Sequence, residues 1–522
     1  MVRLLLILAL LVFLSFYNLG LNAVWQPNEA FYAETARELL VNGDWLNLTY
    51  NGEPRLNKPP ATYWATALSF KHFGLTEFAL RLVPFLSALG TALLLILYGW
   101  RLKSFTFGVV SSIIVLSSLQ VFALARYDSP EMPLLFTLTG ALIFLHLYDL
   151  GGKFKYLWLL LSGVFLSWAL LVKGIPFLAI YLGVWFLYKL AGLFVERNFS
   201  LGDFLKSQLP VWFIGALASL PVLGWYWWAY QHYGELFIKT FYSEVIHRAL
   251  NEQKGLQPFF YLVVILWAFL PYSLHFYYSL LGLLTKNRHL LNPKGLLFPL
   301  VWFAVVLAAF TVAKGKIPVY ILPAFPAMAL LTARLYDKEH PVITVLNWSI
   351  LLITTGVFFY LLYTFGFYQD SVTFAVLLLS LTLWFTLKGS DILRNTVAVI
   401  PFLFLFVHSV LPFVEKYRPY KPLFAELNNL YPKSEYKLVC LRSFFKNFPF
   451  YRRDIVPIIR TAEELKKFET EKVLLFAPKP LNGWKVVKEV ELYTGSESRF
   501  LVMLKDIKKH KRFRKFYFLV KE

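Results

Sequence analysis

Residues 25–37 read Trp-Gln-Pro-Asn-Glu-Ala-Phe-Tyr-Ala-Glu-Thr-Ala-Arg and lie between the first two long apolar runs of the chain, 2–21 and 78–100. An Asn-Lys-Pro-Pro stretch follows at 57–60. Long connections in compact architectures are usually functional. This one carries carboxylates, a lysine and two prolines beside a hydrophobic bundle. We therefore expect the chemistry of the protein to take place at this loop.

The composition around the loop is that of an integral membrane protein. Of 522 residues, 58% are hydrophobic and only 16% are charged, whereas soluble domains carry about 25% charged residues. The single cysteine, Cys440, excludes an intramolecular disulfide framework and a cysteine-based metal site. Although the net charge is +21, basic residues beside membrane spans usually set orientation or meet anionic headgroups. Membrane lipids are therefore expected partners, and nucleic acid is not.

Apolar runs near 20 residues long predict transmembrane helices, because the hydrocarbon core of a bilayer is about 30 Å thick. The N-terminal run lacks a small-residue cleavage site, so we interpret it as a retained first helix rather than a signal peptide. The expected spans are thirteen, at 2–21, 78–100, 105–124, 131–149, 156–172, 174–189, 209–230, 258–283, 295–313, 317–334, 341–365, 370–387 and 392–414.

The placement of Lys and Arg predicts the orientation of these spans. Cytoplasmic loops carry an excess of cations. If the N-terminus is inside, every predicted inner loop is basic, with Arg101, Lys103, Lys153, Lys155, Lys189, Arg197, Lys206, Lys286, Arg288, Lys294, Arg334, Lys338, Lys388 and Arg394. The sequence therefore predicts a multi-pass protein of the inner membrane, with a cytoplasmic N-terminus and larger outer loops at about 22–77 and 231–257.

The composition changes after residue 414, which divides a transmembrane domain, 1–414, from a soluble domain, 415–522. Short β-type runs at 436–441, 472–476, 484–492 and 500–504, with a helix at 425–430, predict a small α/β domain on the outer side. Thr461-Ala-Glu-Glu464 has the form of a capping box that opens a helix. We expect the basic run 505–515 to be solvated or to face lipid.

The first loop predicts an amphipathic helix over 29–40 that lies at the membrane interface, with Glu34 and Arg37 on the face away from its apolar side. Asn28 is a natural N-cap, and Glu29 falls in the first turn, where the helix dipole favours the ionised carboxylate. An ionised group there can orient an acceptor or accept its proton. The alternative is that both residues only start the helix.

Two further polar segments are candidates for a site. Lys58, stiffened by the two prolines that follow, is placed to meet a phosphate; the alternative is an ordinary interfacial lysine. Between the third and fourth spans lies Arg126-Tyr-Asp128. An acid between hydrophobic helices is a functional hypothesis by default. Asp128 is equally consistent with a cap on the next span or a partner of Arg126.

Other cations belong to the same predicted outer face. Lys173 interrupts an apolar hairpin, Arg248 ends Glu244-Val-Ile-His-Arg, and Lys314-Gly-Lys316-Ile-Pro-Val-Tyr320 opens the tenth span. With Arg55 and Lys58 they form a set of six cations, Arg55, Lys58, Lys173, Arg248, Lys314 and Lys316. Such groups suit a lipid phosphate, because charge develops on the oxygen of a departing phosphate.

These motifs resemble those of bacterial lipid-carrier-dependent GT-C glycosyltransferases, which are related to protein O-mannosyltransferases and to the lipid A aminoarabinose transferase. The similar segments cover most of residues 20–330, from Trp25-x-Pro-Asn-Glu29 and Lys58-Pro-Pro60-x-x-Tyr-Trp64 to Lys316-Ile-Pro-x-Tyr320. The resemblance implies an α-helical polytopic GT-C fold. It implies transfer of a sugar from a polyprenyl phosphate to a lipid or protein acceptor on the outer face. By position, Asn28, Glu29 and Asp128 would act on the acceptor, while Lys58, Lys316 and Tyr320 would hold the carrier phosphate.

The chain departs from the family pattern at several positions. The family's first-loop motif has Asp where this chain has Asn28, and Arg where it has Phe31. The positions that bind a metal in such relatives are Asn57 and Val245 here. We therefore predict no metal and no other cofactor.

The sequence thus predicts direct displacement at the anomeric carbon with inversion. Glu29 and Asp128 would position or deprotonate the acceptor, and Lys58, Lys316, Tyr320, Arg248 and Arg126 would bind the carrier phosphate. One alternative is a non-enzymatic lipid-sugar transporter or flippase. Another is a catalytically inactive relative. The sugar, the acceptor and the oligomeric state do not follow from the sequence.

Overall fold

The computed structural model of the protein describes residues 1–196, 200–250, 257–336, 341–367, 371–386, 391–468 and 470–521. Within these residues the chain forms two compact units, each built from discontinuous segments. The helical unit comprises 1–17, 56–62 and 83–405. The sheet unit comprises 18–55, 63–82 and 406–522. Predicted inner-loop cations Arg197, Lys338 and Lys388, and residues 251–256 of the second outer loop, lie outside the described residues.

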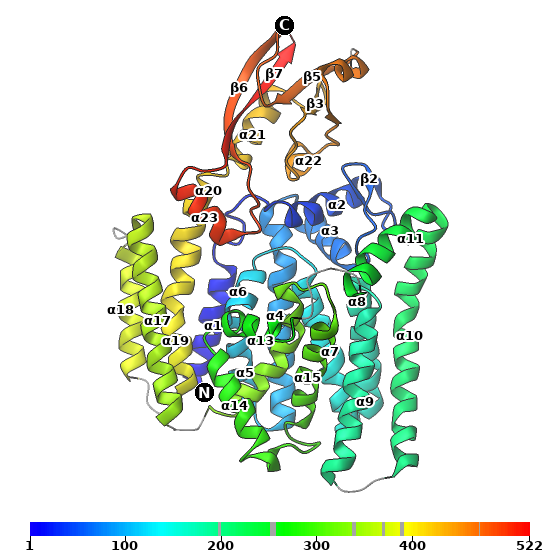
Figure 1. Ribbon diagram of the computed structural model, residues 1–522, viewed down its shortest axis with the longest axis vertical. Helices are drawn as coiled ribbons and strands as arrows, with labels where there is room; N and C mark the ends of the chain where they lie inside the picture. The colour runs from blue at the N-terminus through cyan, green and yellow to red at the C-terminus, as the bar shows by residue number, and fades with distance from the viewer. Residues whose placement is uncertain are drawn as a thin grey trace. The chain divides into compact units, whose positions relative to one another are not determined.

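The helical unit consists of apolar helices that follow the predicted spans closely (Figure 1). Its helices are α1 (Val2–Phe16), most of α4 (Glu77–Leu102), α5 (Phe105–Ser117), α6 (Leu119–Leu124), α7 (Glu131–Leu150), α8 (Lys155–Lys173), α9 (Pro176–Glu196), α10 (Leu201–Tyr233), α11 (Glu235–Phe241), the π-helical turn η1 (Tyr242–His247), α12 (Arg248–Leu250), α13 (Phe260–Ala268), α14 (Ser273–Leu284), the 3₁₀ turn η2 (Arg288–Leu290), α15 (Leu297–Val312), the 3₁₀ helix η3 (Pro318–Ala324), α16 (Phe325–Ala333), α17 (Pro341–Phe365), α18 (Ser371–Thr386) and α19 (Asp391–Leu405).

Each of the thirteen predicted spans coincides with helix, and among the described residues seven helices are long and apolar enough to cross a membrane. The prediction of a polytopic helical membrane fold is therefore confirmed. Four spans are less regular than predicted, and one of them, the thirteenth, contains the π-helical turn η5 (Phe406–Val410). The third breaks at Ser118 between α5 and α6, and the tenth begins as the 3₁₀ helix η3. The eighth breaks between α13 and α14, where Pro271 supplies no backbone N–H for a continuous helix.

The sheet unit combines the first loop with the C-terminal segment. From the first loop come α2 (Asn28–Asn42), the two-stranded pair β1 (Thr49–Tyr50) and β2 (Glu53–Pro54), and most of α3 (Ala61–Phe73). From the C-terminal segment come the π-helical turn η5 (Phe406–Val410), α20 (Leu411–Glu415), α21 (Tyr420–Leu430), β3 (Tyr436–Leu441), α22 (Phe448–Arg452), β4 (Ile458–Ile459), the 3₁₀ helix η6 (Ala462–Phe468), β5 (Lys472–Ala477), β6 (Trp484–Tyr493), α23 (Phe500–Lys508) and β7 (Phe513–Lys521).

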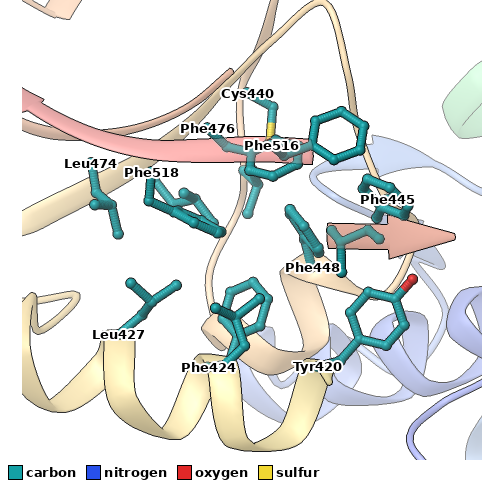
Figure 2. Packing of buried hydrophobic residues seen from close by; sticks show 14 of the residues in the cluster. Tyr420, Phe424, Leu427, Cys440, Phe445, Phe448, Leu474, Phe476, Phe516 and Phe518 are labelled. Atoms are coloured by element: carbon teal, nitrogen blue, oxygen red, sulfur yellow. The ribbon is translucent and has the colours of Figure 1, made fainter. Parts of the chain in front are cut away.

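A five-stranded mixed sheet forms the centre of the sheet unit, with strand order β4-β3-β5-β7-β6. β3 pairs parallel with β4 and β5, whereas β7 pairs antiparallel with β5 and β6. Successive strand side chains point to opposite faces. Accordingly Leu474 and Phe476 of β5 pack with α21 in an aromatic core (Figure 2). Leu475 packs on the other face of the sheet. This burial on both faces explains why β3 and β5 have near-continuous apolar sequences.

One sequence prediction for the C-terminal segment is wrong. Residues 500–504, predicted as a strand, begin helix α23, in which Met503, Leu504 and Ile507 are buried at helical spacing. A short apolar run fits either structure, and here the polar and charged residues that follow continue a helical pattern. The basic run 505–515 keeps its cations exposed, as predicted, but parts of it belong to regular elements. Residues 505–508 end α23 and 513–515 begin β7, whose later residues Phe516, Phe518 and Leu519 complete the sheet core. One half of the predicted capping box forms, since Glu464 accepts from the N–H of Thr461 at 3.1 Å.

The first-loop helix forms as predicted, but its polar face is not exposed. Glu34, Arg37 and Glu38 are all buried. Arg37 donates two hydrogen bonds to Glu34, at 2.7 and 2.8 Å, and a third to the Arg453 carbonyl of the C-terminal segment. Helix α2 is therefore enclosed on its polar side within the sheet unit. Periodicity alone could not show this, because it places charges on one face without saying what covers that face.

Candidate functional site

The helical unit contains a cavity of about 360 Å³. Most of its wall is apolar and mainly aromatic, and α9, α10, α11 and α15 supply these side chains. The rest of the wall is lined by charged side chains. The apolar lining includes Phe177, Ile180, Trp225, Phe237, Phe241, Val305 and Phe310, and the charged lining comprises Lys58, Lys173, Glu244 and Arg248. Ligand sites commonly combine an apolar wall with a few convergent polar groups. The cavity is accordingly our candidate site.

Glu244 is held between two cations of this lining. It belongs to the turn η1, and its carboxylate lies 2.6 Å from Lys58 Nζ and 2.9 Å from an Arg248 guanidinium nitrogen. The amide of Asn57 also donates to Glu244, at 3.1 Å. Lys58 is further fixed by donating to the Asn57 carbonyl at 3.0 Å. The Asn-Lys-Pro-Pro stretch and the second outer loop thus meet at one carboxylate.

Burial and this contact together lower the pKa values of both partners. Burial lowers the pKa of Lys58 below its usual value, although the adjacent Glu244 carboxylate opposes the shift. Burial alone would raise the pKa of Glu244, but Lys58 and Arg248 outweigh it and hold that pKa below its usual range. At neutral pH Glu244 is therefore an anion and a poor proton acceptor, whose charge is shared by two cations.

Lys173 adds a third cation, at the end of α8. Its amine lies 2.9 Å from Glu131, the first residue of α7, and 5.1 Å from the centre of the Tyr320 ring. Gly174 ends α8 with φ +98°, a conformation that favours glycine. A Cβ at this position would lie 2.7 Å from the Tyr226 hydroxyl. Gly174 therefore permits the close packing that places Lys173 in the cavity.

The cavity and its immediate partners include three cations, Lys58, Lys173 and Arg248, against two carboxylates, Glu131 and Glu244. A monovalent or divalent anion that contacts these cations would gain charge-assisted hydrogen bonds. The adjoining aromatic wall would bury an apolar group attached to that anion. Chemically, the arrangement suits an amphipathic phosphate.

Other residues predicted to bind the carrier phosphate have different surroundings. Tyr320 lines the cavity, but Lys316 is buried with its amine donating to the carbonyls of Phe310 and Thr311 near the end of α15. Arg126 donates to the carbonyls of Leu14 and Ser15 near the end of α1. Both side chains thus satisfy carbonyls that a helix C-terminus leaves open.

The predicted acidic residues are both fully buried. Asp128 lies in the connection between α6 and α7. Glu29, in the sheet unit, accepts from Arg81 at 2.8 and 2.9 Å and from the backbone N–H of Trp25 at 2.8 Å. Asn28, by contrast, is exposed as the first residue of α2. In this structure Glu29 therefore has the contacts of a buried ion pair, and the roles of Asn28, Glu29 and Asp128 on an acceptor stay predictions.

Sequence reasoning named Lys173 and Glu244 within motifs but did not assign them to the site, and it missed Glu131. The sequence did contain a signal for Glu131, because it is a carboxylate in the first turn of an apolar span. A charged group in that position requires a partner. Lys173, the partner, lies 42 positions away. Their pairing depends on how α7 packs against α8, which neither residue's local sequence specifies.

The family's metal positions were tested against the local chemistry. Asn57 offers an amide already bonded to Glu244, and Val245 offers no donor atom. Across the described ranges no three His, Cys, Asp or Glu side chains gather as a metal would require. The residues present do not fit a metal ion at this place, and we derive no step through one. That the protein uses no metal or other cofactor stays a prediction.

Comparison with known proteins tests the resemblance. The sequence model of the family described as dolichyl-phosphate-mannose-protein mannosyltransferase matches residues 1–237. An undecaprenyl phosphate-alpha-4-amino-4-deoxy-L-arabinose arabinosyl transferase of Proteus mirabilis is 32% identical over 337 residues, which span 63% of this chain and 58% of that protein. An Aquifex aeolicus protein described as uncharacterized is 37% identical and aligns over 100% of this chain and 99% of its own length.

Similarity at the level of fold extends over the whole chain. The crystal structure of ArnT from Cupriavidus metallidurans bound to undecaprenyl phosphate superposes with a TM-score of 0.77. The alignment covers 99% of this chain and 97% of that one, at 18% identity. The chain belongs to the GT-C family of polyprenyl-phosphate-dependent glycosyltransferases. The family assignment from the first-loop motifs is thereby confirmed, and this GT-C protein is a multi-pass membrane glycosyltransferase.

Proposed function

We propose that this glycosyltransferase binds its polyprenyl-phosphate sugar donor in the cavity of the helical unit. The carrier phosphate contacts Lys58, Arg248 and Lys173, and the first part of the prenyl chain lies along the aromatic wall. The observation that carries the proposal is the combination of three convergent cations with an apolar lining in one cavity. Hydrophobic burial binds the chain, while the cations recognise the phosphate.

The cations also serve the reaction. An acceptor nucleophile attacks the anomeric carbon from the side opposite the phosphate, so the configuration inverts. A hydroxyl acceptor gives up its proton to Asp128 or Glu29, the carboxylates proposed on the acceptor side, whereas an acceptor that is already an anionic phosphate needs no base. The bond between that carbon and the phosphate oxygen breaks, and its electron pair stays on the oxygen. Lys58 and Arg248 stabilise this developing charge. Glu244 keeps the two cations in place, because its low pKa makes it unsuited to take the acceptor's proton.

Named relatives support the donor class. The Proteus mirabilis protein is named for an undecaprenyl phosphate-linked aminoarabinose, and the Cupriavidus metallidurans structure contains undecaprenyl phosphate. This chain aligns with just over half of the Proteus mirabilis transferase. We therefore infer from that relative the class of lipid carrier, but not the identity of the sugar. The acceptor is a lipid or a protein, with Asp128 and Glu29 as the carboxylates proposed to act on it.

Reconstituted vesicles test the donor assignment. The purified protein is supplied with a panel of polyprenyl-phosphate sugars, and release of free polyprenyl phosphate is measured. Lys58→Gln and Arg248→Gln should each raise the KM for the active donor. The control is Lys239→Gln, which removes an exposed α11 lysine that pairs with Glu235 across one helical turn. Unchanged KM in both cavity variants, or no turnover of any donor by the unaltered protein, would refute the proposal.

The carboxylates on the acceptor side require a separate test. Asp128→Asn and Glu29→Gln are assayed for sugar transfer with the active donor, alongside binding of that donor to each variant. Loss of transfer with unchanged donor binding supports a role on the acceptor. Full transfer by both variants would refute that role while leaving the donor site intact.

We also propose that transfer proceeds without a metal ion. Asn57 and Val245 supply no metal ligand set, and the Lys58 and Arg248 cations provide the charge that a metal would contribute. Transfer rates should be the same before and after extensive treatment with a chelator. A rate that falls and returns on adding a divalent ion would contradict this expectation.

A further inference from the structure

Helix α23 and the turn after it combine exposed apolar residues with exposed cations, and these residues have no role in the proposed reaction. On one side of the helix, Met503, Leu504 and Ile507 are buried in the sheet unit. The opposite side exposes two adjacent apolar residues, with Leu501 at 80% and Val502 at 38% exposure. Exposed cations follow these residues along the same segment. An amphipathic helix with lysines beside exposed apolar groups is suited to a membrane surface.

The cations of this segment are available to a partner. Arg499, Lys505, Lys508, Lys509 and Lys511 are exposed, and within the described part of the chain none forms an ion pair. Neighbouring charges are already engaged, since Arg512 pairs with Asp506 at 3.2 Å and His510 with Glu491 at 3.1 Å. Five unpaired cations in thirteen consecutive residues, 499–511, produce a positive surface that favours an anionic partner.

Contacts within the sheet unit place this surface along the last apolar helix. That helix runs without a break in composition from Ile392 to Glu415, and it is long enough to cross a membrane. The Phe500 ring of α23 lies 5.5 Å from the ring of Phe406, which precedes Glu415 by nine positions. At about 1.5 Å per residue, the contact lies roughly 13 Å inside the end of the apolar helix.

The other end of the segment lies near the end of the same helix. Phe513, the first residue of β7, has its ring 6.0 Å from that of Tyr417, just beyond Glu415. The segment from Phe500 to Phe513 thus runs alongside the last part of the span and ends beyond it. Leu501 and Val502 lie toward the apolar end, while the lysines lie toward the polar end. This order matches the passage from acyl chains to headgroups in a bilayer, where long lysine side chains extend to the interface.

We propose that α23 and the turn to Phe513 form a membrane-docking surface, with Leu501 and Val502 among the acyl chains and the lysines on anionic phospholipid headgroups. The occupant is the bilayer itself. Such a contact anchors the sheet unit to the membrane beside the last span.

Site-specific fluorescence tests this docking in full-length protein. Cys440, the one native cysteine, is fully buried, and burial raises the pKa of its thiol, so it gives little background labelling. Leu501→Cys is labelled with an environment-sensitive dye in nanodiscs that carry nitroxide-labelled phospholipid. The matched control is Val486→Cys on β6, another exposed apolar residue. Seven strand positions separate it from Tyr493 at the α23 end of β6, a distance of roughly 23 Å.

The label at 501 should lose most of its emission to the lipid-borne nitroxide, and the label at 486 should lose little. Replacing neutral by anionic phospholipid should increase the loss at 501. Joint substitution of Lys505, Lys508, Lys509 and Lys511 by Gln should remove that increase. Equal nitroxide quenching at both positions, or quenching at 501 by aqueous iodide alone, would overturn the proposal. So would burial of the 501 label from both quenchers, because a protein partner would then cover the helix.

Discussion

Glu244 illustrates how one carboxylate controls two cations. Its substitution by Gln removes the charge that supports protonation of buried Lys58, so the pKa of Lys58 should fall further below its usual value. Donor binding requires the protonated lysine and is lost as the pH rises through that pKa. The alkaline limb of the profile of 1/KM against pH should therefore move to lower pH in Glu244→Gln. Lys239→Gln should leave the limb in place, and an unmoved limb in both variants would contradict the linkage.

Glu29 and Arg81 form an ion pair in which both side chains are almost fully buried. Arg81 also donates to the carbonyls of Leu19, Asn22 and Ala23, so it organises the segment before α2. Glu29→Gln leaves the Arg81 charge without its counterion. Removing one partner of a buried pair costs about 3–5 kcal/mol. The thermal unfolding midpoint should fall, and Glu29→Gln with Arg81→Met should recover part of the loss. A midpoint equal to that of the unaltered protein would contradict a stabilising role for this ion pair.

At the scale of elements, the end of α8 positions a functional side chain through backbone geometry. Gly174→Ala forces a Cβ into a left-handed conformation and against Tyr226, at a cost of order 1–3 kcal/mol. The strain should shift Lys173, so the KM for the donor should rise. Gly356→Ala, in the middle of α17 with open space around it, adds the same methyl group to a normal helix. It should leave KM unchanged, and equal KM values for the two variants would contradict the role of Gly174.

The elements also show which parts of the fold follow from local sequence. Spans are recognisable because their length and apolarity are local properties, matched to the thickness of a bilayer. The Lys58–Glu244 contact joins positions 186 apart, and Glu131 meets Lys173 only through packing. Hence the motifs identified Lys58 and Arg248, while the carboxylates that pair with the cations required the structure. Helix α23 escaped prediction because its first five residues, all apolar, carry no periodic signal.

The whole molecule has a predicted orientation that remains to be tested. The basic predicted inner loops place the N-terminus in the cytoplasm and residues 415–522 outside. Because the single native cysteine is buried, exposed cysteines can be introduced one at a time. We expect Ile458→Cys, on exposed β4, to react in intact cells with a maleimide that cannot cross the inner membrane. Lys153→Cys, at an exposed predicted inner turn, should react only after the membrane is permeabilised. Reaction in the opposite order would invert the topology and place the 415–522 segment in the cytoplasm.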